Sequence, residues 1–127
     1  MRYLLDTQIF IWFLEDISCL SERVIKQIEN PLNTRYISIA SLWEMTIKMN
    51  IEKLIIKYDV EQLFEMIEIH GFELLPILKD HLLVYRNLPL IHRDPFDRLL
   101  ISVAMSENLI FITSDDIMSK YDVLTFI

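Results

Sequence analysis

The segment Leu109-Ile110-Phe111-Ile112-Thr113 is apolar at nearly every position, so neither of its faces can be left in water. A strand that is buried on both faces is typical of the middle of a parallel sheet. Residues 2–5 have a similar character, and acidic residues follow both segments within two positions. Strand patterns alternate with helical patterns along the rest of the chain. This alternation predicts an α/β fold with a mostly parallel sheet flanked by helices.

The expected elements follow from apolar periodicity and from residues that start or stop helices. Strands are predicted at residues 2–5, 35–39, 72–75, 109–113 and 123–127. Helices are predicted from residue 9 to 14, from Ser21 to a stop at Asn30-Pro31, from 41 to about 49, from Asp59 to a stop at Gly71, from 80 to 87, and from Asp94 to about 108. Two of these helices have marked starts, because Ser41 and Glu44 have the spacing of a capping box and Pro95 follows a capping Asp94.

The length of 127 residues fits one domain, which we expect to span residues 1–127. The hydrophobic fraction of 53% is high, so we expect apolar surface to remain for a homodimer or an obligate partner. No apolar run has the length of a membrane span, and the N-terminus lacks the pattern of a signal peptide. A single cysteine, Cys19, agrees with a reducing compartment, so we expect a cytoplasmic protein without membrane contact.

The net charge of −7 excludes a general nucleic-acid-coating protein, because such proteins bind the phosphate backbone with lysine and arginine. Any nucleic-acid substrate must therefore be met locally. The acidity is compatible with a cluster of carboxylates around a divalent cation.

Four acids that are far apart in the sequence converge in the predicted fold. Asp6 and Asp115 follow strands, and Glu44 and Asp97 lie near the starts of helices that we expect at the same edge of the sheet, where ligands of such folds bind. Carboxylates held this close need protons or cations between them. An all-oxygen ligand set favours Mg²⁺ or Mn²⁺. Such ions activate water and stabilise phosphoryl charge, which indicates phosphodiester hydrolysis.

The chain resembles PIN-domain endoribonucleases of the VapC toxin type over essentially its whole length. The matching segments are Leu4-Leu5-Asp6-Thr7, Ser41-Leu42-Trp43-Glu44 with Lys48, His92-Arg93-Asp94-Pro95-Phe96-Asp97-Arg98-Leu99-Leu100-Ile101, and Phe111-Ile112-Thr113-Ser114-Asp115. The resemblance implies a PIN-like three-layer sandwich, a Mg²⁺ or Mn²⁺ site, RNA cleavage, and a cognate antitoxin that blocks the site. It implies that the catalytic and metal-binding acids are Asp6, Glu44, Asp97 and Asp115.

Several of these residues also have structural explanations. Taken singly, Glu44 and Asp97 are at the third positions of predicted helices, where a carboxylate favours the helix start. Asp94 is expected to be an N-cap rather than a ligand. Residues near the acids are candidates for contacts with the RNA, and these are Arg98, Arg93, Lys48 and His92. For Arg98 and Lys48 the alternative is an ion pair with a site carboxylate, and for His92 it is a structural hydrogen bond.

Two other functions are compatible with a small acidic α/β domain. A metal-dependent nuclease of related fold that cuts single-stranded DNA has the same residue requirements. A phosphoreceiver-like signalling domain needs paired acids after the first strand and a late strand-end lysine, whereas Asp6 is alone and Lys120 lies beyond Asp115. We therefore favour a metal-dependent endoribonuclease, the toxin half of a toxin–antitoxin pair.

Overall fold

The computed structural model describes residues 1–126. A five-stranded sheet forms its centre, with the order β3-β2-β1-β4-β5 and parallel pairing throughout. The strands are β1 (Arg2–Leu5), β2 (Thr34–Ser38), β3 (Glu73–Leu75), β4 (Ile110–Ile112) and β5 (Thr125–Phe126). The mostly parallel sheet that the sequence predicted is confirmed. Of the last predicted strand, residue 127 lies outside the described residues.

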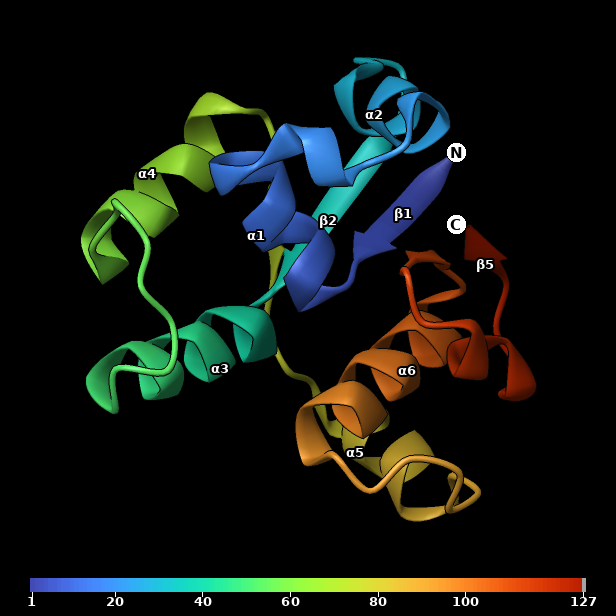
Figure 1. Cartoon of the computed structure of the whole chain (residues 1–127). Helices are drawn as coiled ribbons and strands as arrows, with labels where there is room; N and C mark the ends of the chain where they lie inside the picture. The colour runs from blue at the N-terminus through green and yellow to red at the C-terminus, as the bar shows by residue number, and fades with distance from the viewer. Residues whose placement is uncertain (127) are drawn as a thin grey trace.

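Six α-helices surround the sheet within residues 1–126 (Figure 1). They are α1 (Thr7–Glu15), α2 (Glu22–Glu29), α3 (Ile39–Asn50), α4 (Val60–Ile69), α5 (Lys79–Arg86) and α6 (Pro95–Glu107). Two short 3₁₀ segments, η1 (Ile17–Cys19) and η2 (Asp116–Lys120), complete the described elements. None of these helices is both long and apolar enough to cross a membrane, as judged over residues 1–126.

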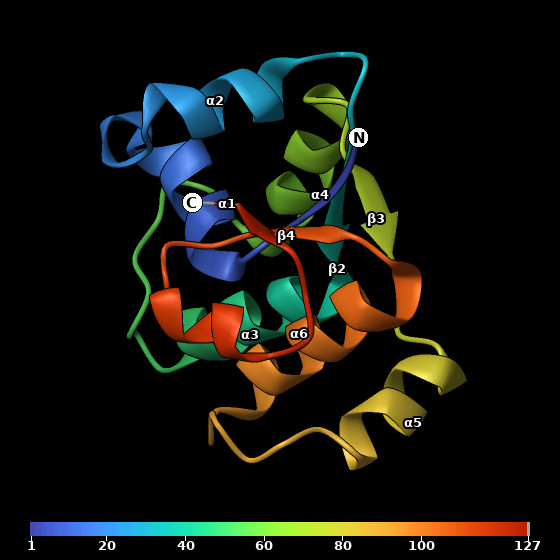
Figure 2. The same cartoon turned by 90° about the vertical axis from the view of Figure 1, so that its right-hand side faces the viewer.

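Alternate residues of β1 pack into two separate hydrophobic cores. Tyr3 and Leu5 lie among side chains of α1, α2 and α4, whereas Leu4 lies among side chains of α6. Figure 1 shows the same division, with α1, α2 and α4 on one side of β1 and β2 and with α5 and α6 on the other. The result is the three-layer sandwich that the resemblance implied. Turning the molecule by 90° shows β4 running beside β1 behind the C-terminal segment (Figure 2).

Most helix boundaries have the chemistry expected from the sequence. Ser21 accepts a hydrogen bond from the backbone N–H of Val24 at 3.2 Å and caps α2. Asp59 and Gln62 form a reciprocal capping box at the start of α4. Gly71 follows the end of α4 with a φ of +73°, a conformation that glycine adopts without strain.

The start of α3 differs from the prediction. The helix begins at Ile39, and the Oγ of Ser38 accepts the capping hydrogen bond from the N–H of Ala40 at 3.1 Å. The predicted capping box at Ser41 is therefore wrong, because β2 runs into α3 without a loop and its last residue is the cap. Ser41 is instead a buried residue of the first turn, and its Oγ accepts a hydrogen bond from the Thr7 hydroxyl at 2.8 Å.

Candidate active site

A cleft of about 260 Å³ opens at the carboxyl ends of β1 and β4, where α3 and α6 also present their N-terminal halves. Its lining contains all four acids that the sequence singled out. The lining residues are Asp6, Thr7, Gln8, Ile11, Glu44, Lys48, Asp94, Asp97, Ser114, Asp115 and Met118. The structure thus brings Asp6, Glu44, Asp97 and Asp115 together from four different elements. Among the other lining residues, Gln8 was not predicted, although its position directly after Asp6-Thr7 was a signal for it.

Asp6 lies between β1 and α1, and its carboxylate makes no capping hydrogen bond to α1. The Thr113 hydroxyl donates to Asp6 Oδ2 at 2.8 Å and also accepts from the backbone N–H of Asp115 at 3.1 Å. One hydroxyl therefore orients acids at the ends of two neighbouring strands. Burial raises the pKa of Asp6, the hydrogen bonds from Thr113 and Thr7 lower it, and the charges of Glu44 and Asp115 raise it further.

Glu44 lies in the second turn of α3 and projects into the cleft. Because α3 starts at Ile39, Glu44 is too far along the helix to act as a capping residue, so the structural explanation from the sequence does not hold. Its Oε2 is 2.6 Å from Lys48 Nζ, whereas its buried Oε1 has no hydrogen-bond partner within residues 1–126. The pKa of Lys48 is raised, mainly by the hydrogen bond to Glu44 and also by the charges of Asp94 and Asp97.

Asp97 is the third residue of α6, and the cap of that helix is Asp94. Asp94 Oδ1 accepts from the N–H groups of Phe96 and Asp97, at 2.8 and 3.0 Å, so the predicted N-cap is confirmed. Because Asp94 provides the cap, the carboxylate of Asp97 can line the cleft. Burial raises its pKa to about 7, with further contributions from the charges of the other acids in the cleft.

Asp115 lies close to His92, one of the residues predicted to contact the RNA. His92 Nε2 lies 3.2 Å from Asp115 Oδ2, and the backbone N–H of His92 donates to the Tyr121 hydroxyl at 2.6 Å. Asp115 Oδ1 accepts from the N–H of Ile117 at 3.0 Å and so also starts η2. Asp116 is exposed outside the cleft, which agrees with the preference for Asp115.

The two predicted arginines do not enter the cleft, and here the sequence analysis needs correction. Arg98 is only 8% exposed, and its guanidinium donates to the backbone carbonyls of Leu88, Pro89 and His92 at 3.0 to 3.3 Å. It therefore neither faces a substrate nor pairs with a site carboxylate, but holds the loop before α6. Arg93 is exposed on that loop and is absent from the cleft lining.

The donor set of the cleft fits a hard divalent cation, because every candidate ligand is a carboxylate oxygen and Glu44 Oε1 is buried without a partner. No three His, Cys, Asp or Glu side chains of residues 1–126 are grouped closely enough to form a complete metal site. Mg²⁺ does not require such a group, because it keeps several waters and is usually held by one or two carboxylates. The residues that could hold it are Asp6, Glu44, Asp97 and Asp115.

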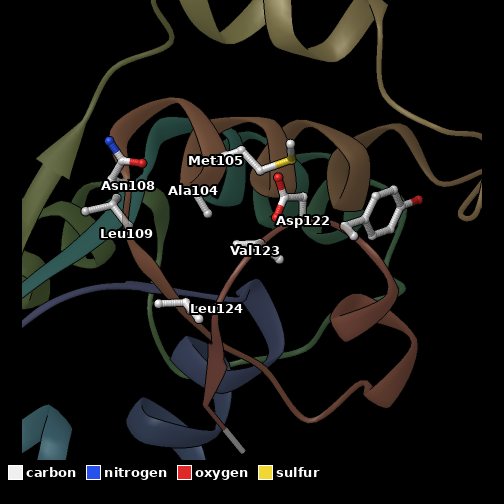
Figure 3. Close-up of a pocket in the computed structure, with 8 residues that line it drawn as sticks. Ala104, Met105, Asn108, Leu109, Asp122, Val123 and Leu124 are labelled. Carbon is white, nitrogen blue, oxygen red and sulfur yellow. The ribbon is translucent and has the colours of Figure 1, made fainter.

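A second cavity, of about 400 Å³, lies at the C-terminal half of α6 (Figure 3). Its lining residues are Ala104, Met105, Asn108, Leu109, Tyr121, Asp122, Val123 and Leu124. Asp122 is the only carboxylate among them, and the four acids of the cleft are all absent. We therefore assign the candidate chemistry to the smaller, acidic cleft.

The fold and the cleft define a class of protein, a parallel α/β sandwich whose central strands end in a group of carboxylates. The PIN domain family model matches residues 3–124. The chain belongs to the PIN domain family. PIN domains are nucleases, that is, hydrolases that act on phosphodiester bonds. No significant match was found among curated protein sequences.

Solved structures with the same fold include several VapBC complexes. VapBC2 from Rickettsia felis, bound to a DNA fragment from its promoter, aligns with a TM-score of 0.73 at 18% identity, over 99% of this chain and 98% of the other. DNA-bound VapBC from Salmonella typhimurium gives 0.71 at 17% identity, over 99% and 97%. VapBC-5 from Mycobacterium tuberculosis, a member of the VapBC family of toxin–antitoxin systems, gives 0.58 at 20% identity, over 94% and 89%. These similarities show that the chain shares their fold.

Proposed function

We propose that this chain is a Mg²⁺- or Mn²⁺-dependent endoribonuclease of the VapC type, the toxin component of a toxin–antitoxin pair. The observation that carries the proposal is the convergence of Asp6, Glu44, Asp97 and Asp115 on one cleft. Four carboxylates repel one another unless cations or protons lie between them. The pKa values of Asp6 and Asp97 are raised mainly by burial, and the charges of neighbouring acids raise them further.

The residues of the cleft have distinct roles in this proposal. A bound divalent cation would supply activation of water for in-line attack and stabilisation of charge on the phosphoryl oxygen. Thr113 keeps Asp6 and Asp115 in a fixed relative orientation, which is the role of outer residues at metal sites. Glu44 offers a buried oxygen, Oε1, that has no hydrogen-bond partner among residues 1–126. Asp97 is held at the helix start by the cap of Asp94 and faces the other acids.

An apolar surface beside the cleft supports the proposal of a protein partner. It contains a groove of about 220 Å³ lined by Trp43, Leu82, Tyr85, Pro95, Phe96 and Leu99. Trp43 is 60% exposed and Leu82 is 55% exposed. Apolar surface of this kind is typical of interfaces. The partners that we propose are a cognate antitoxin and a second copy of the chain, in the cytoplasm, where RNA is available as substrate.

The experiment that tests the function compares Asp6→Asn and Asp97→Asn with the wild type on single-stranded RNA and on single-stranded DNA of the same sequence. We expect the wild type to cut RNA with Mg²⁺ or Mn²⁺ and to be inactive in EDTA. Each substitution should lower the cleavage rate by about 100-fold or more, because a metal-binding carboxylate is lost. Asp80→Asn, an exposed residue of α5 outside the cleft, is the charge-matched control.

Circular dichroism of each variant separates lost chemistry from lost folding. Full activity of both variants on RNA at saturating Mg²⁺ would disprove the assignment. Cutting of DNA alone would favour the nuclease alternative that the residues leave open. Growth arrest on expression, relieved by co-expression of the product of an adjacent small reading frame, would support the toxin role.

A further inference from the structure

Among residues 1–126, Lys48 is the only lysine or arginine that lines the cleft, which also contains five carboxylates. These are Asp6, Glu44, Asp94, Asp97 and Asp115. An RNA phosphate that approaches such a surface is repelled unless a cation faces it. Arg98 is committed to backbone carbonyls and Arg93 lies outside the lining, so neither provides that cation. Within the cleft, Lys48 is therefore the positively charged side chain that can contact a phosphate.

The same lysine is paired with one of the candidate metal ligands. Lys48 lies one turn after Glu44 on α3, and its Nζ is 2.6 Å from Glu44 Oε2. The side chain of Glu44 is 9% exposed, whereas that of Lys48 is 47% exposed. The carboxylate of Glu44 is thus largely buried, whereas the partly exposed side chain of Lys48 has room to change partner. A divalent cation on Glu44 would take over the carboxylate and repel the ammonium group.

We propose that Lys48 is an exchangeable cation, which pairs with Glu44 until a divalent ion binds this carboxylate and then contacts the phosphate backbone of the RNA. This inference rests on the proposed metal-dependent function. It predicts that Lys48 weakens metal binding by competing for Glu44, and that it makes RNA binding depend on the metal. An ordinary helix-surface ion pair does not predict the second effect, because it only stabilises the helix and provides no contact with RNA.

The first measurement is the affinity for Mn²⁺ alone, by calorimetry, of the wild type, Lys48→Met and Lys48→Arg. Lys26→Met is the matched control, because Lys26 is an exposed residue of α2 outside the cleft and the change in net charge is the same. We expect Lys48→Met to bind Mn²⁺ about 3- to 10-fold more tightly, as removal of a partly exposed competing charge predicts. Lys48→Arg and Lys26→Met should remain close to the wild type.

The second measurement is the fluorescence anisotropy of a short labelled single-stranded RNA with and without Ca²⁺. The wild type and Lys26→Met should gain RNA affinity when Ca²⁺ is added, and Lys48→Met should lose most of that gain. The exchange is overturned if Lys48→Met binds Mn²⁺ with the same affinity as Lys26→Met. It is also overturned if Lys48→Met shows the full Ca²⁺-dependent gain in RNA affinity. In both cases the nuclease proposal stands. A wild type that binds no Mn²⁺ overturns both.

Discussion

Replacing Asp97 by asparagine should stabilise the fold at neutral and alkaline pH in the absence of divalent ions. The pKa of Asp97 is raised from 3.8 to about 7, with burial as the largest cause and the charges of Asp6, Asp94, Glu44 and Asp115 adding to it. The protonated carboxyl group is therefore the form that the native cleft favours. Asparagine has nearly the same shape and carries no charge, so the substitution removes the repulsion and keeps the packing.

The size of the effect follows from the shift of the pKa. A shift from 3.8 to about 7 corresponds to roughly 4 kcal/mol at 1.36 kcal/mol per pH unit. Asp97 is partly exposed and is screened by solvent and salt, so we expect a gain of about 2 kcal/mol. For a chain of 127 residues this raises the Tm by roughly 6–10 °C.

The pH dependence has a defined sign. The folded-state pKa lies above the unfolded-state value, so the native protein keeps a proton that the unfolded chain releases between pH about 4 and 7. The stability that protonated Asp97 contributes is fully present below pH about 4 and is lost as the pH rises through about 7. The advantage of Asp97→Asn should thus be complete at pH about 8, and less than half of it should remain at pH about 5.

The assay is urea unfolding in EDTA at several pH values, followed by circular dichroism. Asp80→Asn provides the control for a general change of net charge. Addition of Mg²⁺ should stabilise the wild type more than Asp97→Asn, because the variant lacks one candidate ligand. An Asp97→Asn protein that is no more stable than the wild type at pH about 8 would refute the electrostatic account of the cleft.

Two further substitutions test the groups that hold the site. Thr113→Val removes the hydroxyl that bonds both Asp6 and Asp115. We expect kcat/KM for RNA cleavage to fall by about 10- to 100-fold while the fold is retained. An unchanged kcat/KM would contradict the orienting role of Thr113. Arg98→Met removes the donors to three loop carbonyls. The free energy of unfolding should therefore fall by about 2–4 kcal/mol, and trypsin should cut after Arg93 faster than in the wild type. Unchanged unfolding and proteolysis would show that the loop keeps its conformation without Arg98.

The central place of β1 and β4 in a parallel sheet and the meeting of the acids were predictable from local patterns. Leu4 and Phe111 belong to segments that are apolar on both faces, and such segments are buried in the centre of a parallel sheet. Acids that follow two such strands must lie at the same edge, since the carboxyl ends of parallel strands coincide. Asp94 followed by Pro95 predicted the start of α6, and in the structure α6 begins at Pro95 with Asp94 as its N-cap.

The start of α3 and the role of Arg98 were not predictable in the same way. Ser38 and Ser41 are both plausible caps, and only the position of the last hydrogen bond of β2 decides between them. Arg98 has the sequence neighbours of a substrate contact, yet it is buried and its guanidinium donates to backbone carbonyls of the loop before α6. The start of α3 and the contacts of Arg98 both depend on tertiary structure, which cannot be predicted from the spacing of apolar residues.

The pairing of β1 with β4 has a consequence for synthesis of the chain. Asp6 emerges from the ribosome well before Ile112, yet its backbone N–H donates to the carbonyl of Ile112 at 2.9 Å, in the strand that precedes Asp115. The carboxylate cluster cannot be complete until β4 and Asp115 have left the ribosome. A chain that terminates before β4 therefore carries no finished cleft.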